Sequence, residues 1–181
     1  MADGAGSGAW AKLTASQLTG TGNSFGGQLL HVRDERSSGT ANSDIGTGTT
    51  WTQRVLNTSK TNEISSATLV SNQISLPAGT YYIDAEAPHF LVADAGHIDG
   101  KSKLYNITDS SDILVGNTIS MEGNSSGVVR GVFRSRIRGR FTLAGTKTVE
   151  IRSIQSTPGS IPAAGFSTTE VYTDVSIWKI A

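Results

Sequence analysis

Hydrophobic and polar positions alternate with a period of two along residues 129–143, VRGVFRSRIRGRFTL. Arginine falls only on even positions, at Arg130, Arg134, Arg136, Arg138 and Arg140. The odd positions hold the large apolar residues, Phe133, Ile137, Phe141 and Leu143. Because successive side chains of a strand point to opposite faces, this spacing predicts a strand with one cationic face and one core face. A helix would spread both sets around its circumference.

Two other segments sort their residues in the same way. In TYYIDAEA, residues 80–87, the even positions include Tyr82, Asp84 and Glu86. In TTEVYTDVSIWKI, residues 168–180, the even positions include Glu170, Tyr172, Asp174, Ser176 and Trp178. The odd positions of both segments are mainly apolar. If these three strands lie side by side in one sheet, their acids and arginines pair across the strands.

Short strand-like runs and turn clusters alternate through the rest of the chain from residue 28. Turn signals at intervals of about 8–12 residues separate about eight to ten such runs. The stretches 37–50 and 157–167 are expected to be loops, and 88–102 is expected to be partly extended and then a loop. No sustained helical period and no internal repeat is found. The pattern predicts an all-β fold, a sandwich or jelly roll.

The first 27 residues differ from the rest because they are rich in glycine and serine. Such a segment cannot bury enough apolar surface to fold alone. Its few large apolar residues, Trp10, Leu13, Leu18 and Phe25, suit anchors for the groove of a partner. A disordered tail is the alternative. We therefore divide the chain into an irregular attachment arm, residues 1–27, and a head domain, residues 28–181.

Composition and charge argue against several functional classes. The 181 residues include 15 basic and 15 acidic side chains, and this balance argues against general nucleic-acid binding. There is no cysteine to form a disulfide or a thiolate metal site. No run approaches the ~18 apolar residues of a membrane helix, so we expect no membrane insertion. The N-terminus lacks a secretory signal pattern, which favours synthesis in a cytoplasm without export by that route.

Candidate catalytic and metal-binding residues are few. Asp94, His97 and Asp99 fall close together, but loop polarity explains them more simply than a metal site. Asp84 and Glu86 share a strand face, as the paired carboxylates of a glycosidase do. Neighbouring arginines favour the ionised carboxylate and disfavour a role as general acid. We expect no catalytic residue, no metal and no cofactor.

The charged strand faces allow three interpretations. A charged face can simply be solvated, it can bind phosphate or an anionic glycan, or it can form a subunit interface with arginine–carboxylate pairs. The same faces carry the aromatic residues Tyr82, Tyr172 and Trp178. Aromatic residues and arginine are enriched at interfaces, so the aromatic residues favour the third interpretation.

The order of several segments resembles a known family. LPAGTYYIDAEA, the turn AGTKTVEI after a long strand, and the hydrophobic terminal strand resemble the globular head of the tumour-necrosis-factor and complement superfamily. The resemblance covers about residues 28–181. Segments such as HVRDERSSGT, KLYNITD, RSRIRGRFTLAGTKTVEI and EVYTDVSIWKI resemble more specifically the phage and prophage branch, found in tail-fibre and other virion-appendage proteins.

The resemblance implies a trimeric jelly roll of about ten strands, preceded here by the extended arm. In such heads, the strands that match the three two-faced segments lie together at the three-fold axis. The resemblance therefore implies a trimer interface that includes Tyr82, Asp84, Glu86, Arg134, Arg136, Arg138, Arg140, Glu170, Tyr172, Asp174 and Trp178.

The expected function is that of a structural protein in a phage virion, made in the cytoplasm of the bacterial host. As a tail-fibre, head-fibre or decoration protein, the homotrimer would attach to capsid or tail proteins through residues 1–27. It would contact a host surface glycan or protein through the loops at 37–50, 88–102 and 157–167. A stand-alone carbohydrate-binding module is the alternative, and a polysaccharide-degrading enzyme is a third possibility.

Overall fold

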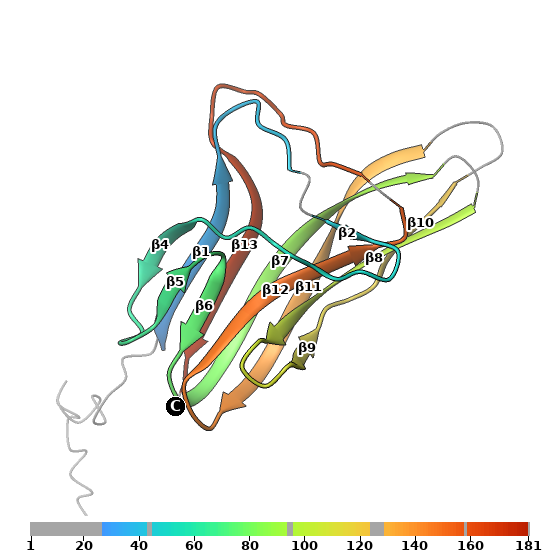
Figure 1. Ribbon diagram of the computed structural model, residues 1–181. Coiled ribbons are helices and arrows are strands. Elements are labelled where there is room, and N and C mark those ends of the chain that lie inside the picture. The colour runs from blue at the N-terminus through green and yellow to red at the C-terminus, as the bar shows by residue number, and fades with distance from the viewer. Residues whose placement is uncertain (1–26, 43–44, 94–95, 124–128, 158, 181) are drawn as a thin grey trace, which may run out of the picture.

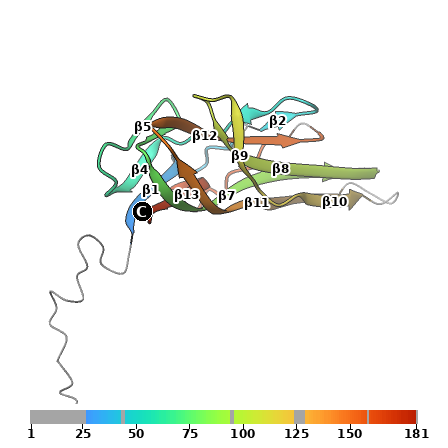
Figure 2. The ribbon, with the colours of Figure 1, turned by 90° about the horizontal axis from the view of Figure 1, so that it is seen from below.

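The computed structural model describes residues 27–42, 45–93, 96–123, 129–157 and 159–180. In this part of the chain there is no helix, and thirteen strands form two sheets that pack face to face (Figures 1 and 2). The prediction of an all-β sandwich is confirmed. No helix of the described residues is long and apolar enough to cross a membrane.

The first sheet has five antiparallel strands. Their order across the sheet is β11 (Val129–Leu143), β7 (Gly79–Ala93), β13 (Glu170–Lys179), β1 (Gln28–Arg36) and β4 (Thr58–Asn62). The three two-faced segments of the sequence are thus neighbours, as predicted. Strand β11 pairs with β7 along its whole length, so the arginines face the strand that carries Asp84 and Glu86.

The second sheet has eight strands. Its main path runs through β10 (Ile119–Gly123), β8 (Gly96–Asn106), β12 (Lys147–Gln155), β6 (Gln73–Leu76) and β5 (Thr68–Val70). The short strands β2 (Gly46–Thr47) and β3 (Thr52–Gln53) pair with β12, and β9 (Ser111–Val115) pairs with β8. The chain passes repeatedly between the two sheets, for example from β6 to β7 and from β11 to β12, which gives the jelly-roll arrangement.

The core lies between the sheets and is built from the alternating positions that the sequence predicts. On β7, Tyr81, Ile83 and Ala85 are buried, whereas the residues between them are partly exposed. On β11, Ile137 and Phe141 are buried while the arginines between them are exposed. Burial of such apolar side chains is the main stabilising contribution to the sandwich.

The segment 88–102, expected to be partly extended and then a loop, is strand for most of its length: it contains the end of β7 and the first part of β8, which belong to different sheets (Figure 1). Pro88 lies inside β7, two residues beyond Glu86, the last residue that β13 pairs with. Beyond Glu86, no residue of β13 pairs with β7, so a ladder on that side does not need the N–H that proline lacks. Gly100 lies in β8 because a Cβ there would approach the buried His89 Nδ1 to 2.8 Å. Both residues therefore have roles other than turn formation.

The other two expected loops are largely confirmed. They meet through a backbone bridge between Asn42 and Ile161, and β2 is the only named strand within the described part of 37–50. Both loops lie at the end of the sandwich where β1 ends and β13 begins (Figure 1). The start of β1 and the end of β13 lie together at the opposite end, since Gln28 pairs with Lys179.

Candidate subunit interface

The outer face of the five-stranded sheet carries most of the residues predicted for an interface. We call this surface the ionic face; it consists of His31, Arg33, Glu35, Tyr82, Asp84, Glu86, Arg134, Arg136, Arg138, Arg140, Asp174, Ser176 and Trp178. These residues alternate with buried core residues along β1, β7 and β11 and along the second half of β13. Four strands therefore present one continuous polar and aromatic surface.

Asp84 is the charged centre of the ionic face. Arg136 binds it in a bidentate manner, with Nε 2.7 Å from Oδ1 and Nη2 2.5 Å from Oδ2. The hydrogen bond from Arg136, opposed in part by desolvation, lowers the pKa of the Asp84 carboxyl. A lowered pKa favours the ionised carboxylate at neutral pH.

An aromatic corner adjoins this ion pair. Arg138 Nε donates to the Tyr82 hydroxyl at 2.6 Å, and its guanidinium also lies 3.8 Å from Asp84 Oδ2. The Tyr82 and Trp178 rings are 6.2 Å apart and tilted by 48°. Tyr82 and Trp178 are both partly exposed in the single chain. The corner thus combines the side-chain types that interfaces favour.

Strand β1 adds ionic-face residues that the sequence analysis did not select. His31 Nε2 and Arg33 Nε each lie 2.8 Å from an oxygen of Asp174. Glu35 accepts from Lys60 of β4 at 3.2 Å. Part of the signal was available, because apolar Leu30 and Val32 alternate with polar His31 and Arg33, although the charged residues 34–36 interrupt the pattern. The test of alternation, applied to this segment, would have found His31 and Arg33 but not Glu35.

The arginines of β11 exceed the carboxylates available to them. Arg134 lies 3.7 Å from Glu86, and Arg136 and Arg138 share Asp84. Arg140 is exposed, and within the described residues no carboxylate lies within ion-pair distance of it. Strand β11 is also an edge of its sheet, so this surplus cationic charge lies along an open side of the molecule.

The connection between β9 and β10 covers part of the open edge of β11. Asn117 N donates to the Arg136 carbonyl at 3.0 Å, and the Ser135 hydroxyl donates to the Asn117 carbonyl at 2.8 Å. Such local cover blocks further strand pairing at this point. It also fixes the backbone that carries Arg136, the partner of Asp84.

We predict that Gly116→Ala destabilises the protein. A Cβ at this position would lie 2.8 Å from the Arg136 carbonyl oxygen and 3.0 Å from the Ser102 carbonyl oxygen. Overpacking of this kind costs about 1–3 kcal/mol of unfolding free energy. Urea denaturation measures the loss. Gly145→Ala is the matched control, because nothing lies within 4 Å of its Cβ position; an equal midpoint for the two variants would contradict the prediction.

A hollow of about 240 Å³ opens on the ionic face between β7 and β13. Its walls are Asp84, Glu86, Arg136, Asp174, Ser176 and Trp178. All of these come from the two-faced segments, and they include three carboxylates and one indole.

Glu170 and Tyr172 do not belong to the ionic face, and this part of the prediction is wrong. Between the pairs Arg33–Asp174 and Glu35–Val171, β13 contains one residue more than β1. This bulge reverses the alternation, so Glu170 and Tyr172 are buried while Val171 is exposed.

Glu170 and Tyr172 instead form hydrogen bonds with the two loops at the end of the sandwich. Glu170 accepts hydrogen bonds from the backbone N–H groups of Gly39, Ala164 and Gly165, which hold the pKa of its carboxyl below the ordinary value. The Tyr172 hydroxyl donates to the Thr40 carbonyl at 2.7 Å. Their role is therefore to order the two loops rather than to pair with arginine.

Solved structures of similar fold include two of murine APRIL and one of an insect protein. The murine APRIL structure at pH 8.5 has a TM-score of 0.49 at 8% identity, covering 84% of this chain and 98% of that chain. The structure at pH 5.0 has a TM-score of 0.48 at 9% identity, covering 85% and 99%. Eiger TNF from S. frugiperda has a TM-score of 0.47 at 10% identity, covering 86% and 94%. No protein family and no curated protein matches the chain.

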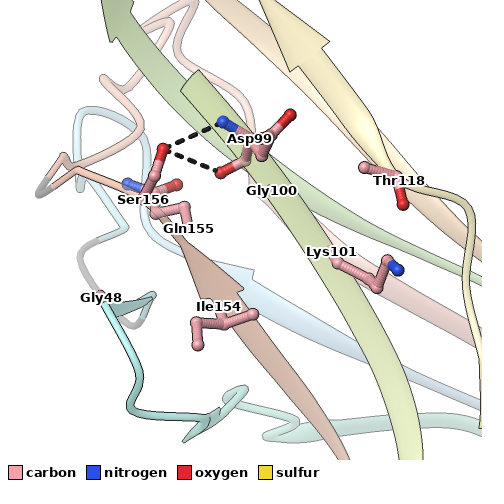
Figure 3. A pocket seen from close by; sticks show the side chains of 8 residues that line it. All are labelled: Gly48, Asp99, Gly100, Lys101, Thr118, Ile154, Gln155 and Ser156. Atoms are coloured by element: carbon pink, nitrogen blue, oxygen red, sulfur yellow. Dashed lines mark hydrogen bonds between the residues drawn. The ribbon is translucent and has the colours of Figure 1, made fainter. Parts of the chain in front are cut away.

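A second hollow, of about 300 Å³, lies on the other sheet among β2, β8, β12 and the segment before β10 (Figure 3). Asp99 and Ser156 lie at one wall, where the Ser156 hydroxyl accepts from the Asp99 N–H at 2.9 Å. Lys101 and Thr118 line the opposite side. In the part of the chain that the structure describes, no group of three His, Cys, Asp or Glu residues could hold a metal.

The predicted anchors Trp10, Leu13, Leu18 and Phe25, together with Asp94, lie outside the described residues. The structure does fix where the arm joins the head, because β1 starts at Gln28 beside the end of β13.

Proposed function

We propose that this chain is a structural protein of a phage virion, with a homotrimeric head formed by residues 28–181. The observation that carries the proposal is the ionic face. It joins arginines, carboxylates and two aromatic side chains in one surface on the outer side of a sheet whose inner side forms the core. A face that was merely solvated would not need Tyr82 and Trp178.

The pairs within the ionic face prepare it for association. The Arg136–Asp84 pair and the Arg138–Tyr82 hydrogen bond hold long side chains in place before a second copy arrives. Ordering side chains in advance reduces the entropy lost on binding. The planar guanidinium group of arginine can bind a carboxylate on a facing surface through two parallel hydrogen bonds, with opposite charge. The same surface on each copy is then buried under closed symmetry.

The two ends of the head suit an attachment end and a contact end. The arm joins the head where β1 starts, whereas the loops around 37–42 and 159–169 lie at the far end. The resemblance of the segments to phage appendage proteins supports placement in a virion, with the arm bound to capsid or tail proteins.

The contact end presents a large apolar side chain. Phe166 is 80% exposed and lies between Gly165 and Ser167, both with positive φ. The hydrogen bonds to Glu170 hold this turn. A rigid turn that exposes an aromatic ring supports contact with a host surface glycan or protein.

The alternative functions make different predictions. A stand-alone carbohydrate-binding module would bind glycans as an isolated head with no need for particles or for trimers. A polysaccharide-degrading enzyme would release reducing sugars from host polysaccharide. The arm is the feature that separates the virion proposal from both.

Deletion of residues 1–27 tests the attachment. We expect the remaining head to fold and to form trimers, because the described core and the ionic face lie within 28–180. We expect the truncated protein to be lost from particles, measured by immunoblot of purified virions made in its presence. The full-length chain is the control, and equal incorporation of the truncated chain would refute anchoring by the arm.

A further inference from the structure

The ionic face leaves one carboxylate poorly compensated. Among the described residues, the ion pair of Glu86 is a long one, with Arg134 at 3.7 Å, and the side chain of Glu86 is 40% exposed. Arg136 stands opposite Glu86 but binds Asp84. In the register of β7 and β13, Glu86 stands directly opposite Asp174. Two like charges directly opposite each other are destabilising in an antiparallel pair. Asp174 is turned toward His31 and Arg33 of β1, so nothing on β13 compensates Glu86.

The hollow beside Glu86 is suited to a cation. Its walls include three carboxylates, of which Asp84 is paired with Arg136 and Asp174 with Arg33. Glu86 therefore carries the negative charge that remains for a further cation. Trp178 lines the same hollow, and an indole ring attracts a guanidinium laid over its face. The hydroxyl of Ser176 adds an acceptor.

The same surface carries an arginine without a carboxylate. Arg140 stands opposite Tyr82 in the β11–β7 register, whereas Arg136 and Arg138 stand opposite Glu86 and Asp84. It is exposed, and the described residues place no carboxylate within ion-pair distance of it. Strand β11 is the edge of the sheet, so Arg140 lies where a neighbouring copy can meet it.

We propose that Arg140 of one copy enters the hollow of the next copy and pairs there with Glu86. The inference rests on the proposed homotrimer. Arg140 and the hollow with Glu86 lie at different places on the same chain. Each copy therefore inserts its own Arg140 into one neighbour and accepts the Arg140 of the other. Such a heterologous contact closes into a ring when the rotation returns to the first copy. A specific ion pair fixes the relative position of the two copies and favours the correct partner, which the size of the buried area does not do by itself.

Charge reversal tests this pairing in the full chain. We expect Arg140→Glu and Glu86→Lys each to cause loss of the trimer at micromolar concentration, measured by sedimentation velocity. The double variant Arg140→Glu/Glu86→Lys should form the trimer again, because the pair is restored with opposite polarity. The matched control Arg138→Glu/Glu86→Lys should stay dissociated. Far-UV circular dichroism of every variant confirms that the sandwich is folded.

Each outcome decides between the two proposals. If the unmodified chain is a monomer, the homotrimer itself is wrong. If the unmodified chain is a trimer and both single reversals remain trimers, the homotrimer stands and the Arg140–Glu86 pairing is wrong. Dissociation of the single variants without recovery in the double variant also overturns the pairing. Recovery in the Arg138 control as well would show attraction by general charge rather than by this pair.

Discussion

Replacement of Arg138 by glutamate is expected to convert the proposed trimer into folded monomers. In the single chain, Arg138 is 58% exposed, donates to Tyr82 and lies 3.8 Å from Asp84. Loss of exposed contacts of this kind costs a single chain only about 0–1 kcal/mol, so the sandwich should remain folded. In the proposed interface the same change would place a new carboxylate beside Asp84 on a surface that association buries. Uncompensated buried charge costs about 3–5 kcal/mol, enough to abolish association at micromolar concentration.

Sedimentation velocity of the variant and the unmodified chain measures this effect. Arg130→Glu is the control, because it makes the same charge change near the start of β11, opposite Val92 rather than Asp84. We expect the control to lose less of the trimer. An Arg138→Glu protein that sediments as a trimer would place the ionic face outside the interface.

Acidification from pH 7 to pH 5 is expected to remove about 2 kcal/mol of unfolding free energy through His89 alone, and about 3 kcal/mol by pH 4. His89 is fully buried, and desolvation, together with the charge of Arg54, lowers its pKa from 6.5 to about 4. Below pH 6.5 the unfolded chain therefore binds a proton that the native chain does not bind. The native state thus loses stability as the pH falls through this range, until the native imidazole also takes up a proton.

The neutral imidazole is part of a buried hydrogen-bond network. His89 Nε2 lies 2.9 Å from the Ser102 hydroxyl, which lies 2.8 Å from the Ser153 hydroxyl. All three side chains are fully buried between the sheets. Protonation would place a second cation near Arg54 in this interior, which is why the native state resists it.

Urea denaturation of the unmodified chain and of His89→Gln at pH 7, 6 and 5 isolates this contribution. Glutamine keeps a side chain able to bond with Ser102 but does not titrate. The unmodified chain should lose about 2 kcal/mol more than the variant between pH 7 and pH 5. Parallel loss in both proteins would show that other groups cause the acid sensitivity.

Strand faces were the part of the fold that the sequence predicted best. Along β7 and β11 each side chain is buried or exposed largely according to its position number, so the alternation alone places Asp84 and Arg136 on outward faces. Their adjacency is confirmed by the full-length pairing of the two strands. A two-residue period is a local property, and it needs no knowledge of distant contacts.

Features that depend on the partner strand could not be predicted. The bulge that turns Glu170 and Tyr172 inward exists only in the register between β13 and β1. The stretch 88–102, expected to be partly extended and then a loop, contains Pro88 and Gly100, two residue types common in turns. Pro88 fits inside β7 because β13 no longer pairs with β7 at this position, and Gly100 leaves room for the side chain of His89. Both explanations depend on tertiary contacts.

Native mass spectrometry of the unmodified chain at micromolar concentration tests the burial of the ionic face most directly. A species of three times the 18.9 kDa chain mass, lost in Arg138→Glu, is the result we predict. A single chain of 18.9 kDa at every concentration up to the solubility limit would contradict it.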